Sequence, residues 1–156
     1  MILDERTEFA DAFSVISGAA TIVVGDVIDL EVARDIGNGE PLYLVILAET
    51  EIITGGVAGT IQFRLASDST ANLATSPTTH FETKAFVTDD AGANDAELGP
   101  NTVIAAVALP FEGVVYERFL GLLAVIATTA ITAGTVNAFL THDVTKWKSY
   151  PNAVGA

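Results

Sequence analysis

The stretch Thr60–Leu65, with the sequence TIQFRL, decides the fold class because polar and apolar side chains alternate along its whole length. Successive side chains of a β-strand point to opposite faces, so Ile61, Phe63 and Leu65 share one face and the polar residues share the other. The same period of two recurs along the chain, interrupted at short intervals by Gly, Pro, Asn and Asp. The sequence therefore predicts an all-β protein.

Seven segments follow this pattern clearly and an eighth follows it more weakly. The clear ones are residues 19–24, 42–50, 57–66, 79–88, 102–109, 115–126 and 135–141, and the weaker one is 10–16. Short, evenly spaced strands joined by turns are typical of an antiparallel β-sandwich. We therefore predict a sandwich of jelly-roll type with about eight strands, with another Greek-key sandwich as the alternative.

Local features suggest how some strands are placed and joined. Residues 42–47 and 119–126 are apolar on both faces, which predicts strands in the centre of the sandwich or strands covered by a neighbouring subunit. Gly55-Gly56 separates two apolar runs and predicts a hairpin. Residues 89–100 are polar and small, which predicts a mobile connection without regular structure.

Composition limits both the domain organisation and the partners. The chain has 156 residues, half of them hydrophobic, which predicts one domain over residues 1–144, followed by an extended arm over residues 145–156. Its 20 acidic and 7 basic residues give a net charge of −13, and the basic residues form no dense patch. Such a chain repels phosphate, so we expect no nucleic-acid partner and no anionic membrane.

The sequence also bears on compartment. The N-terminus is acidic where a signal peptide is basic, and the longest apolar run, residues 119–127, is about half of the roughly 20 residues that a spanning helix needs. We therefore expect neither export nor membrane insertion. The absence of cysteine excludes a disulfide scaffold and thiolate chemistry, and it fits folding in a reducing cytoplasm.

Side chains that could carry chemistry are few. His80 lies near Glu82, and His142 lies beside Asp143, but the chain has neither a G-x-S-x-G elbow nor an H-x-x-x-H pair. Glu49 and Glu51 could resemble a glycosidase pair, yet they fit an exposed acidic strand end better. The acidic residues of 89–97 could bind Ca²⁺, although an ordinary solvated loop explains them more simply. We therefore expect no enzyme, no metal and no cofactor.

The C-terminal arm has the composition of a contact segment. It carries Lys146, Trp147, Lys148 and Tyr150, and Trp147 is the only tryptophan in the chain. Tryptophan and tyrosine are enriched at interface hot spots. A cationic aromatic arm on an acidic body suits a contact with another molecule, while folding back onto its own sandwich is the alternative.

Several segments together resemble the capsid cement, or decoration, proteins of short-tailed bacteriophages of the Bordetella-phage type. The longest is ARDIGNGEPL at residues 33–42. The shorter ones are MILD at 1–4, FADA at 9–12, VIDL at 27–30, ERFLGL at 117–122 and YPNA at 150–153. They are spread over nearly the whole chain.

This resemblance implies a jelly-roll protein without catalytic activity, made in the host cytoplasm and bound to the outer surface of an icosahedral capsid. Its partner would be the major capsid protein, whose neighbouring subunits it would staple together. The resemblance also implies a homo-oligomer, with a dimer favoured and a trimer possible. Arg34 and Asp35 lie in the matching segment and are predicted either to contact the capsid or to form an ion pair that holds a local turn.

A second class of function suits the same architecture. A jelly roll can also be a carbohydrate-binding or receptor-binding module of a phage tail. Sugar-binding sandwiches usually display exposed aromatic side chains for stacking, and this chain has one tryptophan and three tyrosines. The structural role on the capsid is therefore the favoured hypothesis.

Overall fold

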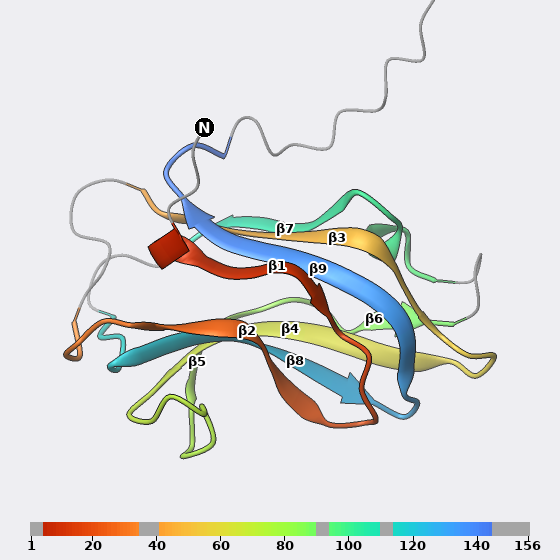
Figure 1. Cartoon of the computed structure of the whole chain (residues 1–156), viewed down its shortest axis with the longest axis horizontal. Coiled ribbons are helices and arrows are strands. Elements are labelled where there is room, and N and C mark those ends of the chain that lie inside the picture. Colours follow the sequence, from red (N-terminus) through yellow and green to blue (C-terminus); the bar gives the residue numbers. More distant parts are fainter. Residues whose placement is uncertain (1–4, 35–40, 90–93, 110–113, 145–156) are drawn as a thin grey trace, which may run out of the picture.

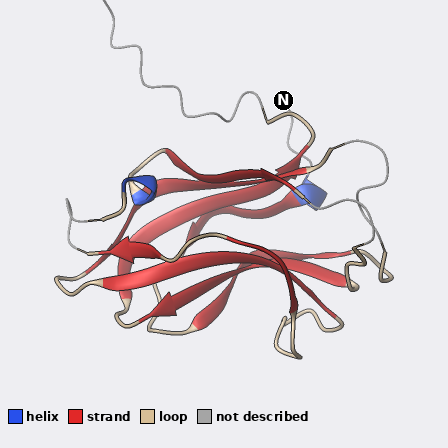
Figure 2. Ribbon diagram, turned by 180° about the vertical axis from the view of Figure 1, so that it is seen from behind, coloured by secondary structure: helices blue, strands red, loops and turns tan. Residues whose placement is uncertain are grey.

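Two antiparallel β-sheets lie face to face in this computed structural model, which describes residues 5–34, 41–89, 94–109 and 114–144 (Figure 1). Sheet 1 has the strand order β1-β9-β3-β7, and sheet 2 has the order β2-β8-β4-β5, with the short β6 also paired to β4. The strands are β1 (Glu8–Ser14), β2 (Thr21–Asp29), β3 (Tyr43–Thr54), β4 (Gly59–Asp68), β5 (Thr78–Glu82), β6 (Phe86–Thr88), β7 (Thr102–Ala108), β8 (Phe119–Ala127) and β9 (Ile131–Thr141). Two short 3-10 turns, η1 (Glu5–Thr7) and η2 (Ala96–Leu98), complete the regular structure of the described residues (Figure 2).

The connectivity is that of a jelly roll. From β1 to β4, and again from β6 to β9, each connection carries the chain from one sheet to the other. This interleaving of two Greek keys places strands that are distant in sequence side by side, as with β1 and β9. The predicted antiparallel sandwich of jelly-roll type is confirmed.

The core lies between the two sheets and contains the face predicted from the alternating stretch. Ile61, Phe63 and Leu65 are completely buried, and they face Leu44 and Ile46 of the opposite sheet in the same apolar cluster. Complete burial of each such side chain contributes about 1.5–3 kcal/mol to folding. The binary pattern of the sequence therefore selects which face of β4 turns inward.

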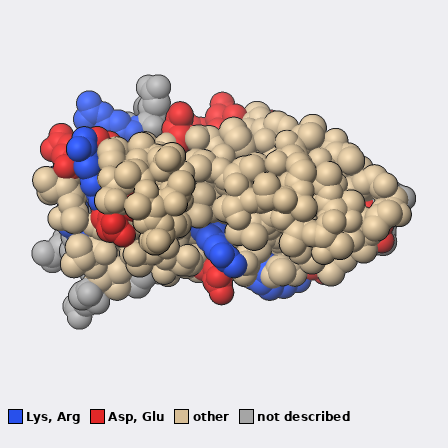
Figure 3. Space-filling view, turned by 90° about the horizontal axis from the view of Figure 1, so that it is seen from below, with Lys and Arg blue, Asp and Glu red and all other residues tan. Residues whose placement is uncertain are grey.

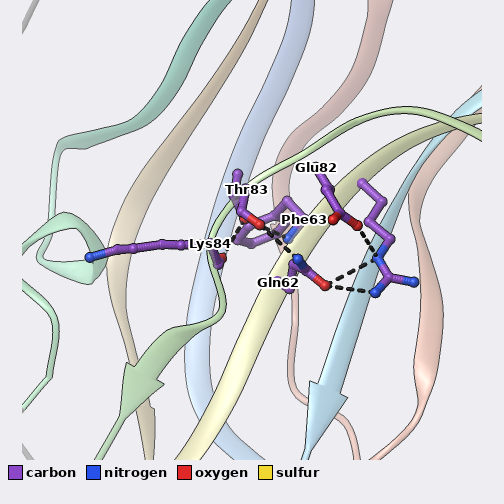
Figure 4. A network of polar contacts seen from close by, with 6 residues as sticks. Gln62, Phe63, Glu82, Thr83 and Lys84 are labelled. Carbon is purple, nitrogen blue, oxygen red and sulfur yellow. Dashed lines mark hydrogen bonds and ion pairs between the residues drawn. The ribbon is translucent and has the colours of Figure 1, made fainter.

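One predicted strand, residues 79–88, is broken into β5 and β6. Figure 4 shows the cause at Thr83, whose hydroxyl accepts a hydrogen bond from the backbone N–H of Phe63 at 3.1 Å. The Thr83 hydroxyl also donates to the carbonyl of Lys84 at 2.8 Å. The Thr83 N–H still donates to the Phe63 carbonyl at 2.9 Å, but the Thr83 hydroxyl takes the place of a backbone carbonyl as the acceptor for Phe63. The regular ladder is interrupted here, and the described residues form nine strands instead of about eight.

The predicted hairpin at Gly55-Gly56 is wrong. The segment joins β3 to β4, and these strands belong to different sheets. The glycines form a turn between two apolar runs, as expected, but this turn crosses from one layer to the other. The local sequence predicts the turn, whereas the pairing of each strand depends on residues that are distant from it in the sequence.

The apolar run of residues 119–126 lies in the centre of a sheet, as predicted, because β8 pairs with β2 on one side and β4 on the other. The predicted start at residue 115 is too early. The strand begins at Phe119, and Tyr116 instead forms an isolated bridge with Arg34.

Residues 94–100 are anchored, which corrects the prediction of a connection without regular structure. Asp95 accepts a hydrogen bond from the backbone N–H of Val87 at 2.9 Å, and Lys84 lies 3.4 Å from the same carboxylate. Leu98 of η2 is completely buried. The first half of the predicted connection includes residues 90–93, which lie outside the described part of the chain.

The two long sides of the sandwich differ. At the β1–β2 side, Gly25 has a φ of +65° and its backbone lies against the carbonyl oxygen of Phe9, leaving no room for a side chain at residue 25. The opposite side, where β7 faces β5 and β6, contains a groove. In the part of the chain that the structure describes, no helix is long and apolar enough to cross a membrane.

Candidate functional site

The outer face of sheet 2 presents a broad uncharged surface, seen in Figure 3 as an area with few Lys, Arg, Asp or Glu side chains. Strand register brings its residues into two cross-strand rows. The first row is Thr21, Val125 and Gln62, and the second is Ala127, Thr60 and Val87. These six residues, all partly or fully exposed, are called the outer patch.

A projecting loop, residues 69–77 between β4 and β5, stands on the same face of sheet 2 (Figure 1). Leu73 attaches it to the sheet, because this side chain is 4% exposed and packs with Ala66 and Leu123 in a second small apolar cluster. Gly121 lies beneath Leu73, where an added Cβ would be 2.5 Å from the Leu73 side chain. Because Gly121 has no side chain, β8 leaves room for Leu73 to pack against the sheet.

The buried carboxylate of Asp68 organises this loop from its base. One carboxylate oxygen accepts hydrogen bonds from the Ser69 hydroxyl at 3.2 Å and the Thr70 backbone N–H at 3.3 Å. The other accepts from the backbone N–H of Thr75 at 2.7 Å. Burial raises the pKa of Asp68, but the hydrogen bonds from Thr75, Thr70 and Ser69 together outweigh it and hold the pKa below its usual value. Asp68 is therefore ionised at neutral pH, where it accepts all three of these hydrogen bonds.

Backbone strain also marks the loop. Leu73 has a φ of +50° and Ser76 a φ of +62°, a region that side chains other than glycine rarely occupy. Such conformations persist only where surrounding contacts enforce them, and they concentrate at functional sites. The loop is thus a rigid projection with an uncharged polar surface of Thr, Asn and Ser side chains.

Charged side chains gather at the end of the sandwich where β2 ends and β8 begins (Figure 3). Here the Arg118 guanidinium forms a two-pronged ion pair with Asp29, with N–O distances of 2.9 and 2.8 Å. The backbone N–H of Glu31 also donates to Asp29 at 2.7 Å. The Arg118 hydrogen bond first, and then the Glu31 N–H, lower the pKa of Asp29 to about 2. This carboxylate stays ionised over the whole physiological range.

Arg34 lies at this charged end, held by its backbone rather than by its side chain. Its N–H donates to the Tyr116 carbonyl at 2.9 Å, and the Tyr116 N–H donates back at 3.0 Å. Its guanidinium is 3.9 Å from the carboxylate of Glu31, and the Arg34 side chain is 48% exposed. The ion pair that the structure records for Arg34 is thus with Glu31, and a weak one, so most of the side chain remains accessible.

The other interface residues predicted from the sequence lie outside the described residues. These are Asp35, Lys146, Trp147, Lys148 and Tyr150. The structure therefore places Arg34 near the Asp29–Arg118 pair. It does not test the predictions for the remaining five residues.

His80 has a structural environment. Its ring is half-buried, lies 4.1 Å from the Tyr116 ring between centroids, and bonds to the Ser67 hydroxyl at 2.7 Å. Ser67 is completely buried and also accepts the backbone N–H of Glu117 at 2.9 Å, so its oxygen cannot reach a substrate. Burial lowers the pKa of His80, and the Glu117 carboxylate opposes that effect. The expected neighbour of His80, Glu82, instead pairs with Arg64, at 3.3 Å.

The remaining candidates also bind structural partners. His142 bonds through Nδ1 to the Pro41 carbonyl at 3.1 Å. Glu49 accepts from the Thr135 hydroxyl at 3.1 Å, and Glu51 accepts from the Asn94 amide at 3.0 Å. No group of three or more His, Asp or Glu side chains placed to hold a metal ion occurs among the described residues.

Sequence reasoning missed the projecting loop and the Asp29–Arg118 pair. The loop does have a local signal, because DSTANLATSP at residues 68–77 is rich in Ser, Thr, Asn and Asp and ends in proline. The ion pair has none, because 89 residues separate its two partners.

Comparison with known proteins gives one family. A family model described as Bbp16 matches residues 9–140, which include every strand from the second residue of β1 to the next-to-last residue of β9. No curated protein matches the chain.

Proposed function

Because the chain belongs to the Bbp16 family, a family of Bordetella-phage type, we propose that it is a non-enzymatic structural protein of a phage particle. In this proposal it is a cement protein that binds the outer surface of an icosahedral capsid. It joins neighbouring subunits of the major capsid protein and thereby stabilises the shell.

The observation that carries this proposal is the continuous outer face of sheet 2. The outer patch offers uncharged side chains on rigid strands, and the projecting loop beside it has a shape fixed by Asp68 and Leu73. A preorganised surface loses little conformational entropy on binding, which favours a stable contact without a reactive site. Arg34 adds an exposed guanidinium at the charged end of the sandwich.

Repetition makes modest contacts sufficient. An icosahedral shell presents the same binding site many times, and a protein that touches two adjacent subunits gains from the high effective concentration of the second site. A homodimer would double the number of such contacts, which is why we include a dimer in the proposal. The net charge of −13 further suits a capsid surface of opposite sign.

The copy number in purified phage particles tests this function. Quantitative mass spectrometry against the major capsid protein should give a ratio on the order of one copy per capsid subunit, as symmetric assembly requires. A few copies per particle would contradict the cement role and support a tail-associated carbohydrate- or receptor-binding module. Absence from the particle would remove a virion role altogether.

A further inference from the structure

A groove lies along the side of the sandwich where β7 faces β5 and β6. It is a shallow groove, open to solvent, with a volume of about 460 Å³ between the edge of sheet 1 at β7 and the β5–β6 edge of sheet 2. Its lining is mainly apolar, with three charged side chains, Glu82, Lys84 and Glu97. The main lining residues are Phe81, Phe86, Ile104, Val107, Lys84 and Glu97.

The strand that borders this groove lacks the usual protection of a sheet edge. Among the described strands, β7 pairs with β3 alone, and its sequence TVIAAVA contains neither a charged residue nor a proline. The N–H of Leu109 points to β3, where it donates to the Leu42 carbonyl at 2.9 Å. Since hydrogen-bonding direction alternates along an antiparallel strand, the N–H groups of Ala108 and Ala106 point away from β3. Natural proteins rarely leave such an edge uncovered.

We propose that this groove is the docking site of the chain's own C-terminal segment, residues 145–156. The segment adds to β7 as a further antiparallel strand and inserts Trp147 into the groove. This inference does not depend on the proposed function.

The point where β9 ends makes this docking possible. Thr141 of β9 and Ala108 of β7 both pair with Tyr43, so both strands end at the same end of sheet 1. His142 then contacts the carbonyl of Pro41, just before β3, which is on the β7 side of β9. A chain that leaves this point and turns back must run antiparallel to β7.

The length of the segment is sufficient. Crossing from β9 over β3 to the far side of β7 spans three strand spacings, about 14 Å, which four to five extended residues cover at roughly 3.3 Å each. The crossing therefore ends near Lys146. About ten residues remain, more than the seven of β7.

The composition of the segment fits the outermost position in a sheet. Lysine and proline are the residues that natural edge strands use to prevent further pairing, and the segment carries Lys146, Lys148 and Pro151. Its two lysines also suit the groove, because Glu82, Lys84 and Glu97 together give that lining a net charge of −1. Lys84 is already paired with Glu97 at 3.1 Å, so it repels the segment weakly. Attachment to the same chain favours this occupant over a second molecule.

Tryptophan fluorescence of the full chain tests the proposal, because Trp147 is the only tryptophan. The native protein should show emission shifted to shorter wavelength than N-acetyltryptophanamide and strong protection from acrylamide, both independent of protein concentration. Val107→Glu places a charge in the groove and should shift the emission maximum to the wavelength of the unfolded chain. Val57→Glu, at a residue that is 61% exposed in the β3–β4 connection, is the matched control and should leave it unchanged.

Hydrogen exchange on the unmodified protein gives an answer even if Val107→Glu does not fold. The amides of Ala106 and Ala108 should exchange slowly, as paired strand amides do. Solvent-like exchange of both, or emission typical of exposed tryptophan in the free protein, would overturn the proposal and return the segment to a contact with another molecule. A wavelength shift that develops only as dimers form in sedimentation would assign the groove to the segment of a second copy and would equally overturn it.

Discussion

The backbone of Gly25 lies directly against the carbonyl oxygen of Phe9, and this contact brings β2 and β1 together at one long side of the sandwich. Gly25 sits in the irregular part of β2, between the regular pairs Val24–Leu122 and Ile28–Leu120. Only glycine combines the φ of +65° with the absence of a Cβ that this approach needs. The contact therefore joins the edges of two different sheets through backbone alone.

Gly25→Ala should lower the free energy of unfolding by at least about 2 kcal/mol, since it adds a steric clash to an unfavourable backbone conformation. Urea denaturation measures this loss. Gly18→Ala is the control, because no atom lies within 4 Å of a Cβ added there. Equal stability of the two variants would contradict the close approach of β1 and β2.

Asp68→Asn should loosen the projecting loop while the sandwich stays folded. An amide has one acceptor oxygen and cannot satisfy the N–H groups of both Thr70 and Thr75. The amides of these two threonines should exchange faster, and Tm should fall by several degrees. Asp26→Asn, at an exposed position, serves as the control. Unchanged exchange at both threonines would show that Leu73 alone holds the loop.

Val125→Arg places a charge in the centre of the outer patch and should abolish or strongly weaken binding to capsids that lack the protein. The domain should remain folded because Val125 is only partly buried. Co-sedimentation with such capsids measures the effect. Val57→Arg, outside the patch, should bind like the unmodified protein. If Val125→Arg also binds normally, the outer face of sheet 2 is not the contact surface.

Arg34→Ala should weaken capsid binding and leave stability within about 0.5 kcal/mol, because only a long ion pair with Glu31 is lost. The backbone bridge to Tyr116 does not depend on the side chain. Arg34→Lys keeps the charge and should retain part of the binding. A large loss of stability in Arg34→Ala, with normal binding, would instead assign the side chain to the turn.

The pKa of His80 should lie below 6.5 and should fall further in Glu117→Gln, because the carboxylate of Glu117 favours the protonated ring. A proton then binds the unfolded chain more readily than the folded one. The stabilising effect of the neutral ring is therefore complete above pH 6.5 and decreases as the pH falls below that value. NMR titration of the imidazole in both proteins measures the shift, and an upward shift in Glu117→Gln would contradict it.

Features of the fold that depend on neighbouring residues could be predicted from the sequence, whereas features that depend on residues far apart along the chain could not. Alternation along Thr60–Leu65 is local, and it correctly gave a strand with one face in the core. The break at Thr83 was missed because it requires Phe63 as a partner, 20 residues away. The turn at Gly55-Gly56 was located correctly, but its assignment to a hairpin failed because pairing with β9 and β8 decides the sheet of each flanking strand.

The candidate site follows the same division. Arg34 was singled out from its segment, whereas its bridge to Tyr116 and its proximity to Asp29 and Arg118 come from contacts between distant parts of the chain. The outer patch was unpredictable for the same reason, because it exists only where β2, β8, β4 and β6 lie in register.

By itself, then, the sequence determined the β class, the antiparallel sandwich, the inward faces and the acidic, cysteine-free character of the surface, because periodicity, turn residues and charge are local or additive properties. Only the tertiary structure decided which strands are neighbours, where Leu73 seats the projecting loop, and where Gly25 lets β2 approach β1 closely. These depend on contacts between residues far apart along the chain, whose energies exist only once both segments are in place.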